Sequence, residues 1–214
     1  TAGFALVSLL IINILAFTVA YLLTKAIKGS NIFRTVFFMP NLIGGIVLGY
    51  IWSMIFDGIL SRYNTSILLN STYGFWGLII LMAWQQIGYM MIIYIAGLQA
   101  VPVDMLEAAK IDGASEWKTL WNIIIPNVMP SITICTFLTL TNSFKLYDQN
   151  LALTNGRPYN GVIHTTEMLA LNIVNSNTLK TKGVGQAKAV MFFVLVAIIG
   201  IFQMKATHDK EVQQ

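Results

Sequence analysis

The feature that most restricts the fold of this chain is a series of apolar runs, each about long enough to cross a lipid bilayer. A helix needs roughly 20 apolar residues to cross the hydrocarbon layer. Five runs reach or approach that length, at residues 1–24, 36–56, 74–100, 128–146 and 185–204. Charged residues make up only 10% of the chain. Because backbone groups inside a bilayer must be paired within their own segment, the runs predict an all-α, polytopic transmembrane helix bundle.

Proline positions help to place the starts of two of these runs. Pro40 lies near the start of the second run, and Pro126 and Pro130 lie near the start of the fourth. Proline is tolerated in the first turn of a helix, because its missing N–H would have no partner there. We therefore expect the second span to start near residue 38 and the fourth near residue 128.

Basic residues indicate which side of the membrane each loop occupies. Lys25, Lys28 and Arg34 cluster after the first run, and such clusters are typical of cytoplasmic loops. Alternation of the spans then predicts a cytoplasmic loop at 102–127, a cytoplasmic tail from 205, and external loops at 57–73 and 147–183. Thr1 already lies inside an apolar run, so we expect a further span upstream of it.

The rare residue types argue against several kinds of site. Cys135 is the single cysteine, and His164 and His208 are the two histidines, so we expect neither an intrachain disulfide nor a metal centre. The formal net charge of +4 is spread thinly, which argues against nucleic-acid binding. A membrane enzyme would need several reactive groups that converge at one depth. His164 and Glu167 are close in sequence, but no further metal ligand or nucleophile accompanies them. We therefore expect no catalytic residues.

The polar segment EAAKIDGASEWKTLWNIIIP, at residues 107–126, interrupts the apolar runs. Asp104 followed by Glu107 has the spacing of a capping box and predicts a short helix over 105–112. Gly113 then supplies a left-handed stop at no steric cost. Ala108 and Ala109 give this helix a small-residue face, on which another backbone can approach closely.

A second short helix follows this glycine. Ser115 is placed to cap it, and Pro126 is placed to end it. An apolar stripe recurs at helical spacing on Trp117, Leu120, Trp121 and Ile124. The sequence therefore predicts a helix–turn–helix that lies against the membrane face and offers Glu107, Lys110 and Asp112 to a partner. The alternative is a solvated connector between two spans.

The spacing of this segment resembles the EAA loop of permease subunits in bacterial binding-protein-dependent ABC importers. The resemblance is carried by Glu107-Ala108-Ala109, Gly113, Ile123 and Ile125-Pro126, with isoleucine where the family usually has leucine before the proline. The form EAAKIDGA at 107–114 is typical of the carbohydrate-importer branch. The stretches FRTVFFMPN at 33–41, Trp52, and YDQNLALTNGRP at 147–158 are similar to further segments of that branch, although Asn155 and Arg157 replace its glycines.

The resemblance implies the type I ABC-importer permease fold as one domain over 1–214, in a bacterial cytoplasmic membrane. The 102–127 loop would dock on a cytoplasmic ATP-binding subunit. Its contact residues would be Glu107, Ala108, Ala109, Asp112, Gly113 and Pro126. No G-x-x-x-x-G-K-[ST] motif occurs, so ATP and Mg²⁺ are expected in that subunit and no cofactor in this chain. A second permease subunit, expected to be a different homologous chain, and an extracellular solute-binding protein would complete the assembly.

Polar residues within the spans are costly in a membrane, which makes them candidates for a solute pathway. They form two patches, with Gln85, Gln86 and Tyr89 in the third span and Thr139, Asn142 and Ser143 in the fourth. Amides, hydroxyls and an aromatic ring suit an uncharged, hydroxyl-rich solute such as a sugar. The alternative is that these groups hydrogen-bond one helix to another.

These observations predict a membrane subunit that imports a sugar or oligosaccharide. The alternatives are a permease for a polyamine, a phosphate ester or a peptide, and a membrane protein that docks a cytoplasmic partner without transport. Co-purification with an ATPase, together with ATP turnover that a solute stimulates, separates the transport hypotheses from the docking one.

Overall fold

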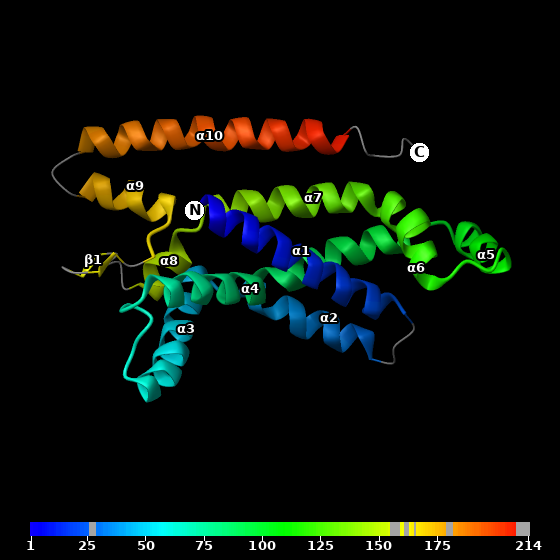
Figure 1. Ribbon diagram of the computed structural model, residues 1–214, viewed down its shortest axis with the longest axis horizontal. Coiled ribbons are helices and arrows are strands. Elements are labelled where there is room, and N and C mark those ends of the chain that lie inside the picture. The colour runs from blue at the N-terminus through cyan, green and yellow to red at the C-terminus, as the bar shows by residue number, and fades with distance from the viewer. Residues whose placement is uncertain (26–28, 155–158, 161–162, 165, 179–181, 209–214) are drawn as a thin grey trace.

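The computed structural model describes residues 1–25, 29–154, 159–160, 163–164, 166–178 and 182–208, which form a bundle of long helices with short helices at its ends (Figure 1). In chain order the helices are α1 (Ala2–Thr24), α2 (Ser30–Phe38), η1 (Met39–Leu42), α3 (Gly45–Leu60), η2 (Ser61–Tyr63), α4 (Ser71–Gln99), α5 (Val103–Ile111), α6 (Glu116–Thr119), the π-helical turn η3 (Leu120–Ile124), α7 (Ile125–Phe144), α8 (Asp148–Leu153), α9 (Leu169–Thr178) and α10 (Lys182–His208). Two-residue strands, β1 (Tyr159–Asn160) and β2 (Ile163–His164), pair antiparallel. The predicted all-α bundle is confirmed, with this hairpin as an addition.

Four of the described helical segments are long and apolar enough to cross a bilayer. They run over Ala2–Thr24, Ser71–Gln99, Glu116–Phe144 and Lys182–Gln203, and they overlap the first, third, fourth and fifth predicted spans. Helix α4 lies at the centre of the bundle. Of the residues in its most apolar 18-residue stretch 67% are buried, against 6% in the corresponding stretch of α10. The exposed apolar surface of α10 suits contact with lipid, because hydrocarbon tails are as apolar as the side chains that face them.

The structure corrects the second predicted span, because no continuous helix covers 36–56. Two helical segments, Ser30–Leu42 and Gly45–Tyr63, meet at a bend of 100° across a short break. Only the two together are long and apolar enough to cross a bilayer. Pro40 precedes the bend, which lies where the backbones of Ile43 and Gly44 are extended. This proline lies buried within the 3-10 turn η1 rather than at the start of a straight span.

The broken span packs against the central helix at Gly88 of α4. A β-carbon at this position would overlap the backbone carbonyl of Phe37 and crowd the backbone of Phe38. Glycine therefore allows α2 to approach α4 at backbone distance, which is a common use of small residues between membrane helices.

A buried polar cluster joins α1, α4 and α7. The Tyr94 hydroxyl donates to Asn13 Oδ1 at 2.7 Å, and Asn13 Nδ2 donates to Leu9 O at 2.8 Å and to Thr139 Oγ1 at 3.3 Å. The Thr139 hydroxyl donates in turn to Cys135 O at 2.7 Å. Each buried polar atom of Asn13 thus has a partner, so the cluster fixes three helices relative to one another.

We expect Asn13→Leu to destabilise the protein by about 1–3 kcal/mol, because the Tyr94 hydroxyl would then lie buried without an acceptor. Tyr94→Phe is the comparison variant, since it removes the donor to Asn13 Oδ1 but leaves Asn13 Nδ2 bonded to Leu9 O and Thr139 Oγ1. Thermal unfolding in detergent measures both variants. A larger loss for Tyr94→Phe than for Asn13→Leu would contradict this account.

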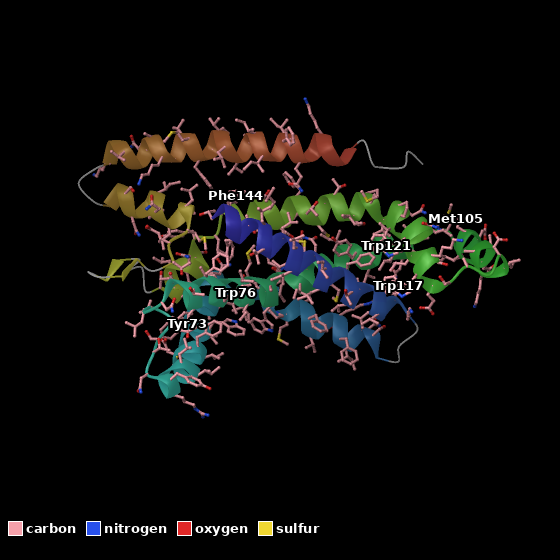
Figure 2. All side chains as sticks on the ribbon, in the orientation of Figure 1. Tyr73, Trp76, Met105, Trp117, Trp121 and Phe144 are labelled. Atoms are coloured by element: carbon pink, nitrogen blue, oxygen red, sulfur yellow. The ribbon has the colours of Figure 1, made fainter. Side chains whose placement is uncertain are left out.

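The two ends of the bundle carry different elements (Figure 1). Helix α5, the end of α1 and the start of α2 gather at one end, and α8, α9 and the hairpin gather at the other. Aromatic side chains mark both ends, with Tyr73 and Trp76 on one and Trp117 and Trp121 on the other (Figure 2). Such girdles are typical of membrane–water interfaces. The predicted basic cluster lies at the α5 end, although Lys28 lies outside the described residues.

Candidate functional site

The polar segment between α4 and α7 projects from one end of the bundle (Figure 1). Its first helix, α5, starts after Pro102, and no side chain caps it. The predicted capping box between Asp104 and Glu107 is therefore not formed. Asp104 still lies in the first turn, where a negative charge is favourable next to the unpaired N–H groups. This leaves the Glu107 carboxylate exposed to solvent and free of an intrahelical role.

Gly113 ends α5 with the left-handed turn that the sequence predicts. Its φ is +70°, a conformation that costs other residues more than glycine. The Ala114 N–H donates to Ala109 O at 2.9 Å, and the Gly113 N–H donates to Lys110 O at 3.3 Å. These two bonds form a Schellman motif, which pairs carbonyls at the helix end and sets the direction of the chain that follows.

Only one of the two alanines predicted to face a partner is exposed on α5. Ala108 is exposed, whereas Ala109 is only 7% exposed and packs within this chain. Asp112 is exposed, and Ile111 is 86% exposed, which is unusual for a large apolar side chain. The α5 surface thus presents Ala108, charged side chains and large apolar side chains to solvent. The exposed charged residues are Asp104, Glu107, Lys110 and Asp112, and the exposed large apolar residues are Val103, Met105 and Ile111.

Ser115 caps the next helix as predicted, because its hydroxyl accepts from the Lys118 N–H at 3.3 Å. Pro126 does not end this helix, which continues from Glu116 to Phe144. The preceding π turn changes the hydrogen-bond register, with the Ile125 N–H donating to Leu120 O. Asn127 Nδ2 also donates to Ile123 O at 2.7 Å. The N–H that proline lacks is therefore not needed for the helix to continue.

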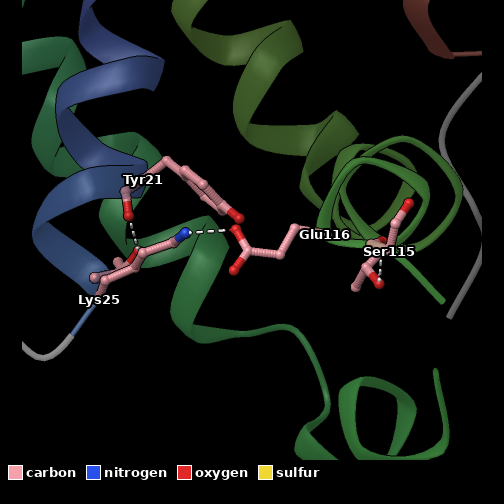
Figure 3. Close-up of polar contacts among 6 residues, drawn as sticks. Tyr21, Lys25, Ser115 and Glu116 are labelled. Atoms are coloured by element: carbon pink, nitrogen blue, oxygen red, sulfur yellow. Dashed lines mark hydrogen bonds and ion pairs between the residues drawn. The ribbon is translucent and has the colours of Figure 1, made fainter. Parts of the chain in front are cut away.

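An ion pair ties the start of α6 to the end of α1. Lys25 Nζ lies 2.9 Å from Glu116 Oε2, and it lies 4.9 Å from the centre of the Tyr21 ring (Figure 3). The hydrogen bond to Glu116 raises the pKa of Lys25 above its ordinary value, and Tyr21 adds to this shift. Both charged side chains are largely exposed, so the pair orients the two helix ends more than it stabilises them.

A polar cavity of about 390 Å³ lies where η1, α4, α7 and α8 meet. It is lined by Asn41, Gln85, Gln86, Tyr89, Asn142, Lys145, Leu146 and Gln149. Four of the six predicted pathway residues therefore line one cavity, from two helices that are far apart in sequence. Of its lining residues, only Leu146 is aliphatic, so the cavity suits a polar solute.

Hydrogen bonds hold the amide side chains of this cavity in place. Gln85 Nε2 donates to Ile43 O at 3.3 Å, at the break in the bent span, and Gln85 Oε1 accepts from Gln149 Nε2 at 2.8 Å. Across the cavity, Asn142 Nδ2 donates to Gln86 Oε1 at 3.2 Å. Tyr89 is 37% exposed and also lines the cavity.

Two of the predicted pathway residues lie elsewhere. Thr139 belongs to the buried cluster with Asn13, and the Ser143 hydroxyl donates to Thr139 O at 2.7 Å. Both side chains are fully buried. Thr139 joins α7 to α1 through Asn13, and the Ser143 hydroxyl contacts Met82 Sδ of α4 at 3.8 Å, so both contribute to packing between helices, as the alternative interpretation allows.

Sequence reasoning missed Asn41 and Gln149 as cavity residues. Asn41 follows Pro40 in η1, and Gln149 lies in α8, beyond the end of a span. Asn41 reaches the cavity just before the break in the second span, and Gln149 reaches it from α8, where its amide donates to Gln85 Oε1. No periodic pattern in the sequence indicates either placement. Among the residues that the structure describes, no group of three or more His, Cys, Asp or Glu could hold a metal ion.

A larger, apolar groove of about 610 Å³ lies between α1 and the α6–η3–α7 helix. Its lining is mainly aliphatic and aromatic and includes Ile14, Phe17 and Leu120, with Asn13, Thr18 and Glu116 among its polar members. The polar cavity is the better candidate for solute binding despite its smaller volume. All of its lining residues except Leu146 carry a polar side-chain group, and they come from four elements.

The family of the chain follows from comparison with known proteins. Residues 12–205 match the family described as "Binding-protein-dependent transport system inner membrane component". The chain belongs to this family. The matched residues include the whole α5–α6 segment and the whole polar cavity, and several apolar helices agree with a multi-pass membrane protein. Residues 155–158 of the predicted external turn lie outside the described residues.

Named relatives in this family are transport permeases. The chain is 43% identical to the probable starch degradation products transport system permease protein AmyD of Thermoanaerobacterium thermosulfurigenes, over 100% of this chain and 75% of the relative. It is 30% identical to the multiple sugar-binding transport system permease protein MsmF of Streptococcus mutans, over 93% of this chain and 71% of the relative.

A solved structure has the same fold. It is a bacterial ABC transporter involved in the import of the acidic polysaccharide alginate, with a TM-score of 0.81 at 16% identity. The likeness covers 97% of this chain and 76% of the transporter chain. The predicted fold class, the type I ABC-importer permease fold, is confirmed.

Proposed function

We propose that this chain is the membrane-spanning subunit of an ATP-driven importer and that it carries a sugar or oligosaccharide across a bacterial cytoplasmic membrane. The observation that carries the proposal is the polar cavity between α4 and α7, the two helices that flank the exposed α5–α6 segment. The names of the relatives support the choice of solute, since they refer to starch degradation products and multiple sugars.

The chemistry of the cavity agrees with a sugar. Side-chain amides both donate and accept hydrogen bonds, as sugar hydroxyls do, so Gln86 and Asn142 can exchange their mutual bond for bonds to a solute. The ring of Tyr89 offers an apolar surface of the kind that stacks on a sugar face. No chemical step is required of these residues, because transport needs only binding that changes between conformations.

The α5–α6 segment is proposed to bind a cytoplasmic subunit that holds ATP and Mg²⁺. Glu107, Ala108 and Asp112 supply its exposed polar and small surface, and the exposed Ile111 supplies an apolar contact. A mixture of exposed apolar and polar side chains is the common composition of a protein interface. Gly113 and Pro126 are proposed to orient the segment and not to contact the partner. Ala109 is buried and packs the segment against the rest of the chain.

Two further partners complete the proposed assembly. An extracellular solute-binding protein would deliver the solute at the end that carries α8 and α9. The alignments support it, because the family is binding-protein-dependent and one similar structure is an alginate transporter in complex with its periplasmic protein. A second permease subunit, homologous to this chain, would cover its exposed apolar helices. The docking-only alternative does not explain a preorganised polar cavity inside the bundle.

The proposal is tested by reconstituting the chain with its ATP-binding and permease partners in lipid vesicles. Each candidate solute is presented with its binding protein, and ATP hydrolysis is measured. We expect maltooligosaccharides or related sugars to raise ATP turnover. Stimulation by a polyamine or a peptide, and by no sugar, would contradict the choice of solute.

The double variant Gln86→Ala with Tyr89→Ala tests the cavity itself. Each change removes contacts worth about 1 kcal/mol to a bound solute, so we expect uptake at low solute concentration to fall about tenfold or more. Ile92→Ala on the same helix is the control, because this side chain is 40% exposed and does not line the cavity. Unchanged uptake kinetics in the double variant would assign Gln86 and Tyr89 to packing.

A further inference from the structure

The polar cavity contains one charged side chain. Lys145 lies just after α7, and it is the single charged member of the lining. The other polar members are the neutral residues Asn41, Gln85, Gln86, Tyr89, Asn142 and Gln149. The polar residues within the spans are neutral and predict no preference for the charge of the solute. The presence of Lys145 in the lining predicts that the charge of the solute matters.

The charge of Lys145 is not neutralised by a neighbour within the described part of the chain. The three other elements that meet at the cavity carry one charged residue between them, because η1 and α4 have none and α8 has Asp148. Asp148 is exposed, packs beside Gly45 of α3, and does not line the cavity. The ion pair that the described residues form, Lys25–Glu116, involves elements at the opposite end of α7.

We infer that Lys145 is a specificity-determining residue that rejects cationic solutes and binds an oxygen acceptor of a neutral or anionic solute. This inference rests on the proposed function of the cavity. Lys145 is exposed to solvent, and a cation that enters the cavity meets its uncompensated positive charge and is repelled by it. An ammonium group also has three donors and no acceptor, so it pairs with hydroxyl, carboxylate or phosphate oxygens.

The inference also separates the solute classes that the sequence leaves open. A polyamine carries several positive charges and would be excluded. A sugar hydroxyl, a uronate carboxylate and a phosphate ester all present oxygen acceptors to Lys145. The residue therefore restricts the charge of the solute without fixing its identity.

The test uses the assembled transporter in lipid nanodiscs and three trisaccharides of similar size. These are neutral maltotriose, anionic trigalacturonate and a cationic glucosamine trimer, in a mildly acidic buffer that keeps the amines protonated. Saturation-transfer NMR gives the three affinities. For the wild-type protein we expect the cationic trimer to bind at least about tenfold more weakly than maltotriose.

The Lys145→Glu variant should raise the affinity for the cationic trimer relative to maltotriose by about tenfold or more, whatever it does to either affinity alone. Arg62→Gln is the matched control, because it removes an exposed positive charge outside the cavity. We expect this control to leave the ratio unchanged.

Equal binding of maltotriose and the cationic trimer by the wild-type protein would overturn the role of Lys145 and leave the proposed function intact. An unchanged ratio in Lys145→Glu would do the same. Binding of none of the three trisaccharides would overturn the proposed sugar function, and the inference with it.

Discussion

Gly88→Val is expected to destabilise the bundle more than any other single change considered in the membrane-spanning part. Its β-carbon would overlap the backbone carbonyl of Phe37, and backbone atoms cannot turn away as a flexible side chain can. Forcing extra atoms into a packed contact costs about 1–3 kcal/mol or more. We expect a midpoint of thermal unfolding that is several degrees lower, together with reduced amounts of folded protein in the membrane.

The matched control is Gly58→Val in α3, where no atom lies within 4 Å of the β-carbon position. The same side chain is added to another helical glycine, but into open space. Equal stability of Gly88→Val and the wild-type protein would mean that α2 does not pack against α4 at this distance. A comparable loss in both variants would point instead to valine itself as the cause.

Gly113→Pro is expected to abolish coupled transport while leaving the protein in the membrane. Proline fixes φ near −65°, whereas this position has a φ of +70°. Proline also removes the N–H that donates to Lys110 O. The Schellman motif would then be lost, and α5 would no longer be held in its orientation to α6. We expect uptake to fall by at least about tenfold, since a small misplacement of a docking element removes its contacts.

Gly113→Asn provides the control, because asparagine adopts the left-handed conformation more readily than other side chains. This variant should keep most of the uptake. Uptake and protein level in the membrane are measured together for both variants. Normal uptake by Gly113→Pro would show that the turn has no part in coupling, and loss of the protein from the membrane would show a folding defect instead.

The sequence predicts the long spans and the local turn chemistry well. Apolar length alone identifies the regions that become α1, α4, α7 and α10, because the cost of unpaired backbone in hydrocarbon leaves helices as the favourable choice. Gly113 and Ser115 are also predicted correctly, since their roles depend on residues within one turn of them.

Features that depend on tertiary contacts are not predictable in this way. At the break, Ile43 O accepts a hydrogen bond from the Gln85 amide, which comes from a helix that is distant in sequence. The faces of Thr139 and Asn142 could not be told apart, because lipid and protein interior are equally apolar and the spans show no clear polar side. Pro126 predicts a helix end from the sequence, yet the helix continues through it. The π turn that makes this possible has no recognisable sequence pattern.

The helix from Glu116 to Phe144 joins the capped segment beside Ser115 to the amide of Asn142, which lies near its other end. The π turn at Leu120–Ile124, with Pro126 directly after it, lies close to the capped end of this helix. Helices bend most readily at such places, so a displacement beside Ser115 would pass through this turn before it reached the space around the solute.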